Sequence, residues 1–144
     1  MKRIPAVKGV MTPFPYSIAI DAPVSEALEF MRRAKIRHLP VVENDKLKGI
    51  VSDRDIKLML GPDFAYPRAE ECTVREAMAP DSYIVDLSTP LDVVLDHMAT
   101  HRIGSAVITR KGKLVGIFTS TDACRAYADL LVREFGNAKG TDAA

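Results

Sequence analysis

The sequence predicts an α+β fold built from two similar halves that pack with pseudo-twofold symmetry. The main observation is an internal repeat, because the chain matches itself without a gap when residues 7–60 are laid over residues 74–127. Of these 54 aligned positions, 13 are identical, and others exchange similar residues, such as Ile18 with Val85, Ile20 with Leu87 and Ser52 with Thr119. Each half has about 55 residues, which is marginal for an independent fold, so we expect the halves to share a core.

The repeat also predicts the domain organisation. We assign residues 1–61 to the first repeat with its N-terminal segment and residues 73–135 to the second repeat. Residues 62–72 are rich in proline and charge and form the predicted linker. Residues 136–144 form a short polar tail that we expect to be flexible.

The elements of the first half follow from its residue patterns. A short β-branched run predicts a strand, apolar residues at helical spacing predict a helix opened by a proline, and two apolar runs around Asn44-Asp45 predict a hairpin. A further helix ends at Gly61-Pro62. The expected order is strand Ser17–Ile20, a helix from Pro23 with the buried stripe Ala27, Leu28, Met31 and Ile36, strands Leu39–Val42 and Leu47–Val51, and a helix from near Ser52 to Leu60.

The second half repeats this order. Its first helix has a favourable start, with Thr89 as the expected N-cap and Pro90 at the first helical position. The expected elements are strand Tyr83–Leu87, that helix, strands Ala106–Thr109 and Leu114–Phe118 around Lys111-Gly112, and a helix from about Ser120 to Phe135 before Gly136. Residues 73–76, Thr-Val-Arg-Glu, carry a capping-box pattern just before the second repeat.

Composition excludes several classes of function. The chain has 20 Lys plus Arg against 19 Asp plus Glu, and this balance argues against a nucleic-acid binder. No apolar run approaches the length of a membrane span, and the N-terminus lacks the apolar stretch of a secretory signal. Cys72 and Cys124 are far apart and form no C-x-x-C pair, as expected for a cytoplasmic protein in which both thiols are reduced.

One motif that occurs in both halves can carry binding chemistry. It reads Gly, two apolar residues, Ser or Thr, two variable residues and Asp, and it ends at Asp55 and at Asp122. Amides at a helix start attract anions, the hydroxyl of Ser52 or Thr119 can bond a sugar or phosphate, and the carboxylate can accept from both hydroxyls of a ribose. The same pattern is also a capping box, which needs no ligand. Both interpretations stay open at this point.

The repeated motifs resemble those of the CBS-domain pair, often called a Bateman module. The likeness covers about residues 7–131. It is carried by residues 10–13 (Val-Met-Thr-Pro), 36–42 (Ile-Arg-His-Leu-Pro-Val-Val) and 49–55 (Gly-Ile-Val-Ser-Asp-Arg-Asp), and by their counterparts at residues 77–80, 103–108 and 116–122. The resemblance implies two interlocked β-α-β-β-α units, frequent homodimerisation, and clefts that bind adenosine-type ligands such as AMP, ADP, ATP or S-adenosylmethionine. It implies that Ser52, Asp55, Thr119 and Asp122 contact the ligand.

Charge distinguishes the two expected clefts. The first half offers Arg37, His38 and Arg54, where the second half has Gly104, Ser105 and Thr121. We therefore expect one stronger nucleotide site and one weaker or empty site, although each basic residue could also be an ordinary surface or half-buried side chain. Apolar residues that could hold the base, or could simply belong to the core, are Ile18, Leu39, Pro40 and Val51 in the first half and Ile84, Val85, Ala106 and Phe118 in the second.

No pattern for catalysis or metal binding accompanies these motifs. The chain has no nucleophile elbow and no Walker loop, and His97 and His101 share a helix face without a carboxylate cluster. We therefore expect no catalytic residue, no metal site and no cofactor beyond a regulatory ligand. The sequence favours a cytoplasmic sensor that binds an adenosine-type ligand between its repeats and signals to an effector protein that the sequence does not name. The alternative is a structural or dimerisation module with unoccupied clefts.

Overall fold

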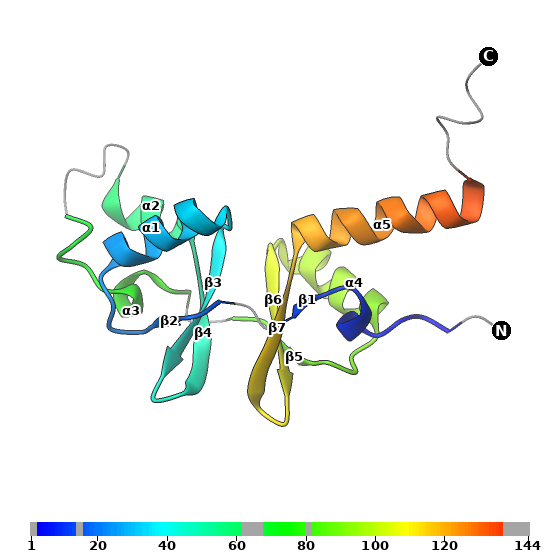
Figure 1. Cartoon of the computed structure of the whole chain (residues 1–144), viewed down its shortest axis with the longest axis horizontal. Helices are drawn as coiled ribbons and strands as arrows, with labels where there is room; N and C mark the ends of the chain where they lie inside the picture. The colour runs from blue at the N-terminus through cyan, green and yellow to red at the C-terminus, as the bar shows by residue number, and fades with distance from the viewer. Residues whose placement is uncertain (1–2, 14–15, 62–67, 80–81, 137–144) are drawn as a thin grey trace, which may run out of the picture.

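The chain forms two halves that lie side by side, each with its own sheet and helices (Figure 1). The computed structural model describes residues 3–13, 16–61, 68–79 and 82–136. The first half holds a three-stranded sheet of order β2-β3-β4, and the second holds a four-stranded sheet of order β1-β7-β6-β5. The predicted α+β fold with two β-α-β-β-α repeats is confirmed.

The same order of elements occurs twice. Along the chain, the first repeat contributes η1 (Val7–Gly9), β1 (Thr12–Pro13), β2 (Ile18–Ala19), α1 (Val24–Ala34), β3 (His38–Glu43), β4 (Lys46–Ser52) and α2 (Asp53–Leu60), of which β1 joins the sheet of the second half. The second repeat contributes α3 (Val74–Ala77), β5 (Ile84–Asp86), α4 (Leu91–His101), β6 (Ser105–Arg110), β7 (Lys113–Thr119) and α5 (Ser120–Phe135). The end of α5 before Gly136 agrees with the sequence prediction.

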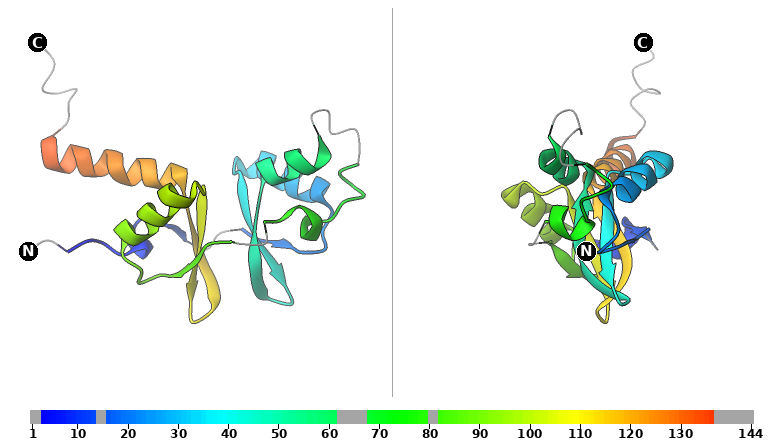
Figure 2. Two further views of the ribbon diagram at one scale, coloured as in Figure 1. Left: turned by 180° about the vertical axis from the view of Figure 1, so that it is seen from behind. Right: turned by 90° about the vertical axis from the view of Figure 1, so that its left-hand side faces the viewer.

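Each half combines a parallel strand pair with an antiparallel hairpin. β2 runs parallel to β3 and β5 runs parallel to β6, whereas β3-β4 and β6-β7 are hairpins. The hairpin turns have positive φ at both central residues, Asn44 and Asp45 in one and Lys111 and Gly112 in the other. Such turns match the twist of the flanking strands. Both hairpins point the same way, with α1, α2 and α5 at the opposite end of the molecule (Figures 1 and 2).

The two halves exchange the segments that precede them. We call residues 3–13 the first leading segment and residues 68–79 the second. The amide of Val7 donates to the carbonyl of Thr89 at 2.8 Å, and the equivalent amide of Val74 donates to Ala22 at 2.9 Å. β1 pairs with β7, and Ala79 forms the matching bridge to Ile50. Each repeat is therefore completed by the leading segment of the other.

The cores follow the same exchange. The first core includes Val74 from the second leading segment, and the second core includes Val7 from the first, both with no exposed surface. A smaller cluster joins the two halves and consists of Ile50, Val107 and Ile117 with Leu47 and Leu114 against it. The halves thus have separate cores that are linked by this cluster, rather than the one shared core expected from their size.

Methionines of the leading segments lie over the strand glycines. A Cβ placed on Gly116 would lie 2.5 Å from Sδ of Met11 and 3.0 Å from the carbonyl oxygen of Thr12. A Cβ on Gly49 would lie 2.6 Å from Cε of Met78. A side chain at either position would displace the segment that crosses it, so glycine at both sites permits the close approach.

The predicted N-cap of α4 is wrong. Thr89 makes no cap, and Pro90 occupies the N-cap position without a side-chain hydrogen bond. The exchanged segment explains the difference, because the amide of Leu91 donates to the carbonyl of Pro5 at 2.8 Å. At the start of α1 the amide of Val24 donates to Cys72 in the same way, at 2.8 Å. A backbone carbonyl from the other leading segment thus replaces the side-chain cap.

The predicted helical stripe of the first half is correct only in part. Ala27 and Met31 are buried, and Leu28 packs against the core from a partly exposed position. Ile36 lies beyond α1, because Lys35 adopts the left-handed conformation that ends the helix. Ile36 still packs against the first core from the turn before β3.

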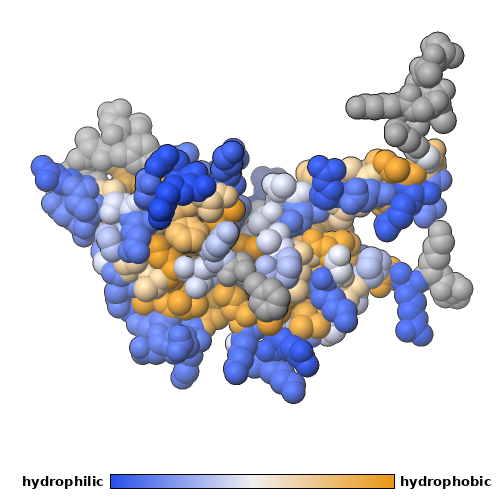
Figure 3. Space-filling model, in the orientation of Figure 1, coloured by the Kyte–Doolittle hydropathy of each residue, from blue (hydrophilic) through white to orange (hydrophobic). Residues whose placement is uncertain are grey.

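The predicted linker and tail fall largely on residues 62–67 and 137–144, outside the described part of the chain. Within that part, no helix is long and apolar enough to cross a membrane. On the face drawn in Figure 3, hydrophilic side chains gather at the hairpin tips and hydrophobic atoms lie between them.

We predict that Val7→Ala lowers the free energy of unfolding by about 2 kcal/mol, because it removes two buried methyl groups and leaves a cavity. Val74→Ala should cost a similar amount, since Val74 occupies the equivalent place in the other core. Urea unfolding measures both. Ile4→Ala is the control, because Ile4 lies in the same segment and is 57% exposed. Equal, small effects of Val7→Ala and Ile4→Ala would contradict the exchange.

Candidate functional site

A cleft of about 810 Å³ lies between the two halves and gathers residues from both. The second half lines it with the start of α5, including Thr119, Thr121 and Asp122. The first half lines it with Arg37 and His38 at the start of β3. The remaining lining residues are Thr12, Pro13, Tyr16, Lys35, Ile36, Ile117 and Ser120. The basic pair of the first half therefore faces the motif of the second half, a choice that the sequence left open.

Both motif aspartates cap their own helices. The amide of Ser52 donates to Oδ2 of Asp55 at 3.0 Å, and the amide of Asp55 donates back to the Ser52 hydroxyl at 3.0 Å. At α5 the amide of Thr119 donates to Oδ2 of Asp122 at 2.9 Å, and the return bond to Thr119 measures 3.5 Å. Since an ionised carboxylate has two acceptor oxygens, these caps leave acceptor capacity for a second partner.

The two caps differ in what their second carboxylate oxygen meets. The hydroxyl of Thr12, from the first leading segment, donates to Oδ1 of Asp122 at 3.1 Å. The residue equivalent to Thr12 in the second leading segment is Ala79, which has no hydroxyl. A threonine and an aspartate from different repeats thus meet at the cleft between the halves, which we call the Asp122 cleft.

Two of the first amides of α5 already have acceptors. The amide of Ser120 donates to the carbonyl of Gly104 at 3.0 Å, and the amide of Asp122 is held by the cap. The helix start therefore offers fewer free donors to an anion than its sequence predicts. Positive charge at this cleft comes mainly from side chains of the first half.

His38 is half-buried at the junction of the halves. Burial lowers the pKa of its imidazole below the ordinary value, and Arg37 lowers it further, against an opposite effect of Asp53 and Asp55. A Cβ placed on Gly104 would lie 3.5 Å from Nε2 of His38. Because position 104 has no side chain, His38 reaches from the first half toward the start of α5.

The remaining predicted site residues lie elsewhere. Ile18 and Leu39 belong to the first core, Ala106 belongs to the second, and Val85 packs against the second core from a partly exposed position. Pro40 is buried within β3. These residues do not line the Asp122 cleft, so their contact with the base of a ligand stays a prediction. The same is true of Val51, Ile84 and Phe118.

Arg54 lies apart from the Asp122 cleft. It lines a shallow hollow on α2 together with Asp53, Lys57, Leu58 and Gly61. Ser52 and Asp55 stand at the start of the same helix and do not line the Asp122 cleft either. The two motifs are thus not brought into one site.

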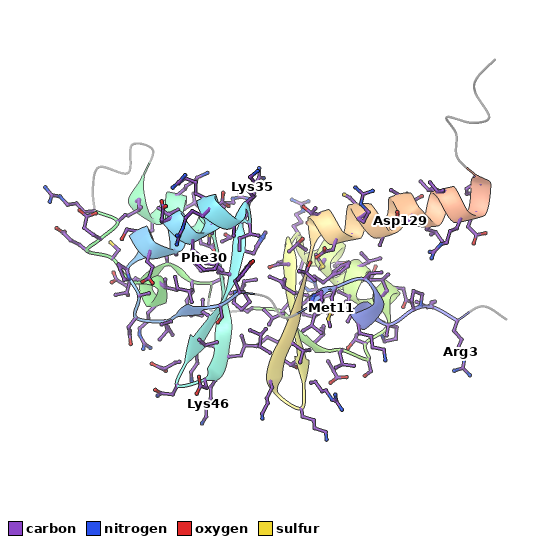
Figure 4. All side chains as sticks on the ribbon, viewed as in Figure 1. Arg3, Met11, Phe30, Lys35, Lys46 and Asp129 are labelled. Carbon is purple, nitrogen blue, oxygen red and sulfur yellow. The ribbon has the colours of Figure 1, made fainter. Side chains whose placement is uncertain are left out.

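Sequence reasoning missed Thr12, Tyr16 and Lys35 as cleft residues. Thr12 sits in the Val-Met-Thr-Pro run that recurs as Ala-Met-Ala-Pro, and this Thr-to-Ala difference was the available signal. Lys35 lies at the end of α1 nearest the second half (Figure 4). Nothing in its local pattern marks it, because its place in the cleft depends on how the halves pack.

Comparison with protein families gives two matches to the CBS domain, over residues 7–61 and 74–129. The chain belongs to the CBS-domain family. Among curated proteins this CBS pair is similar to YhcV of Bacillus subtilis, with 30% identity over 132 residues that cover 92% of this chain and 87% of YhcV. It also matches the zinc metalloprotease MJ0392 of Methanocaldococcus jannaschii, with 34% identity over 128 residues, 88% of this chain but only 33% of that protein.

Among solved structures the CBS pair resembles that of protein MJ0100 in complex with 5-methylthioadenosine and S-adenosyl-L-methionine. The TM-score is 0.76 at 26% identity, with 89% of this chain and 99% of that chain covered. CBS pairs of this kind therefore occur both as nearly the whole of a small protein and as part of an enzyme.

We predict that the free energy of unfolding falls as the pH drops below about 6.5, in part because His38 is held neutral in the fold. Its pKa is lowered by folding. The unfolded chain therefore binds a proton at a higher pH than the native protein does, and acid favours unfolding.

Urea unfolding at about pH 7.5 and about pH 5.5 measures this dependence. His38→Gln should flatten it, and His101→Gln on the exposed end of α4 serves as the control. The same loss of stability in the wild type and in His38→Gln would contradict the prediction.

Proposed function

We propose that this CBS pair is a regulatory sensor that binds an adenosine-type ligand, AMP, ADP, ATP or S-adenosylmethionine, between its halves. The observation that supports the proposal most is the Asp122 cleft, which joins a Thr119–Asp122 motif to Arg37 and His38 from the other repeat. The carboxylate of Asp122 suits a ribose diol, since charge-assisted bonds contribute roughly 1.5–3 kcal/mol each. The complex of MJ0100 with two adenosine compounds adds support by similarity.

The place of the cleft suggests how occupancy could be signalled. Its lining includes Thr12 and Pro13 of the exchanged leading segment as well as residues of both halves, so a bound ligand would contact all three parts. A ligand shifts such an equilibrium only by its differential affinity for the two arrangements. A separate effector protein would read the change. We place the protein in the cytoplasm, in line with its two free thiols, Cys72 and Cys124.

A structural or dimerisation module is the second candidate. The caps formed by Asp55 and Asp122 would serve it without any ligand. α5 also favours association, because none of its residues is buried and it presents Tyr127, Leu131 and Phe135 to the solvent. Figure 3 shows hydrophobic atoms along its outer end. We propose a homodimer for either candidate.

We predict that AMP or a related adenosine compound raises the melting temperature, whereas GTP does not. Ligand at 100 times its Kd adds about 2.7 kcal/mol of stability, or several degrees for a chain of this size. Asp122→Asn should weaken binding by about tenfold or more, because the amide keeps one acceptor for the cap but loses the charge and the second oxygen.

Asp55→Asn is the matched control, since it makes the same change in the equivalent cap. A thermal-shift screen with and without magnesium, followed by calorimetry, measures both effects. A cooperative melt with no shift for any adenosine compound would reject the sensor and favour the structural module.

We also predict that Leu131→Glu with Phe135→Glu converts a dimer into a monomer, because two charges would be placed on the apolar face of α5. Lys111→Glu on a hairpin tip is the control. Sedimentation equilibrium measures the mass. An unchanged dimer in the α5 variant would exclude this face, and a monomeric wild type would reject the homodimer.

A further inference from the structure

We infer that the Asp122 cleft selects phosphate-bearing adenosine ligands over uncharged or cationic ones, and that His38 takes up a proton when such a ligand binds. This inference rests on the proposed function and narrows its ligand class. It separates AMP, ADP and ATP from S-adenosylmethionine, whose sulfonium is positive.

The charges that line the cleft carry the first part. Lys35 and Arg37 face a single carboxylate there, that of Asp122. Among the described residues, neither Lys35 nor Arg37 forms an ion pair. If Asp122 takes the ribose, both cations stay available to an anionic group on the same ligand, and a cationic ligand would meet repulsion from them.

The equivalent positions in the other half lack this excess. Lys35 corresponds to Arg102, but Arg37 and His38 correspond to Gly104 and Ser105. At the start of the helix, Asp53 and Arg54 of α2 stand where α5 has Ser120 and Thr121, so the other half gains one carboxylate and one cation there and has no net excess of cations. The Asp122 cleft therefore suits a phosphate better than the equivalent positions of the other half do, because of the charged residues that line it.

The position of His38 carries the second part. Its ring lines the cleft and approaches the bare backbone of Gly104, where Ser120 Oγ also converges, at 3.7 Å from a Cβ placed there. The charged groups around it are Arg37 on its own strand and Asp53 and Asp55 on α2. Lys35 and Asp122 line the same cleft as His38.

Binding of a phosphate opposes the effect of burial at His38. In the free protein, burial favours the neutral imidazole, Asp53 and Asp55 favour the imidazolium, and Arg37 adds to the effect of burial. A phosphate carries close to two negative charges near neutral pH, and an anion close to His38 favours the imidazolium. The proton comes from the solvent, so affinity for a phosphate-bearing ligand rises as the pH falls toward 6.5.

Isothermal titration of the full chain with AMP, adenosine and S-adenosylmethionine tests both parts. We expect AMP to bind at least about tenfold more tightly than the other two, and Arg37→Gln to remove most of this preference. Arg102→Gln is the control, because Arg102 is the counterpart of Lys35 in the other half and does not line the Asp122 cleft, and it should leave the preference unchanged.

Titration at about pH 7.5 in two buffers of different ionisation enthalpy counts the protons exchanged, and at this pH the phosphate of AMP is already fully ionised. We expect net proton uptake with AMP, none with adenosine, and loss of the uptake in His38→Gln. Similar uptake in His38→Gln overturns the assignment to His38.

Equal affinity for AMP and adenosine overturns the selection for phosphate but leaves the sensor intact. If none of the three compounds binds, the proposed function fails and this inference fails with it. Tighter binding of S-adenosylmethionine than of AMP would mean that the cations of the cleft do not face the ligand.

Discussion

The exchange of leading segments is the constraint on which the rest of the structure depends. Each core contains a fully buried valine from the other repeat, and each first helix begins on a carbonyl from that same segment. Arg75 of the second leading segment adds ion pairs to Asp21 and Glu43 of the first half, but these are exposed and contribute little. Hydrophobic burial and backbone pairing therefore hold the halves together, and neither half is complete without the other.

The cleft is a consequence of this exchange. β1 pairs with β7, and this pairing brings Thr12 to within a hydrogen bond of Asp122. The small cluster of Ile50, Val107 and Ile117 joins the two halves, and the first half supplies Arg37 and His38 to the cleft. A site made from three parts of the chain is thus held by apolar contacts, and of the three buried residues of this cluster only Ile117 lines the cleft.

Much of the fold could be predicted because each element is indicated twice, once in each repeat. The hairpins, α5 and the capping boxes at Ser52, Thr73 and Thr119 depend on local chemistry and occur where the sequence places them. The N-cap of α4 was wrong because the partner of the Leu91 amide is Pro5, a contact with no local signature. The position of Ile36 was wrong because a left-handed Lys35 ends α1 one residue earlier, and lysine is not the residue that usually marks such an end.

The candidate site could be predicted less completely than the fold. Motif residues at both helix starts follow from the repeat, but which of the two motifs faces Arg37 and His38 depends on packing between the halves. The residues expected to hold the base of a ligand are apolar, and most apolar residues of a folded chain are buried in its core. Leu39 and Ala106 are examples, because both are fully buried. Lys35 and Thr12 carry no hydropathy signal, and only the assembled cleft identifies them.

The capping role of Asp122 and the proposed binding role support each other. A cap fixes the carboxylate at the start of α5 before any ligand arrives, so little side-chain entropy remains to be lost on binding. Thr12 holds the other oxygen and belongs to the exchanged segment. A ribose hydroxyl that replaces the Thr12 hydroxyl as donor to Asp122 would break that one hydrogen bond and leave the cap intact. The energetic link between ligand and leading segment is then about the strength of one charge-assisted hydrogen bond, roughly 1.5–3 kcal/mol, which is in the range of typical coupling energies between sites.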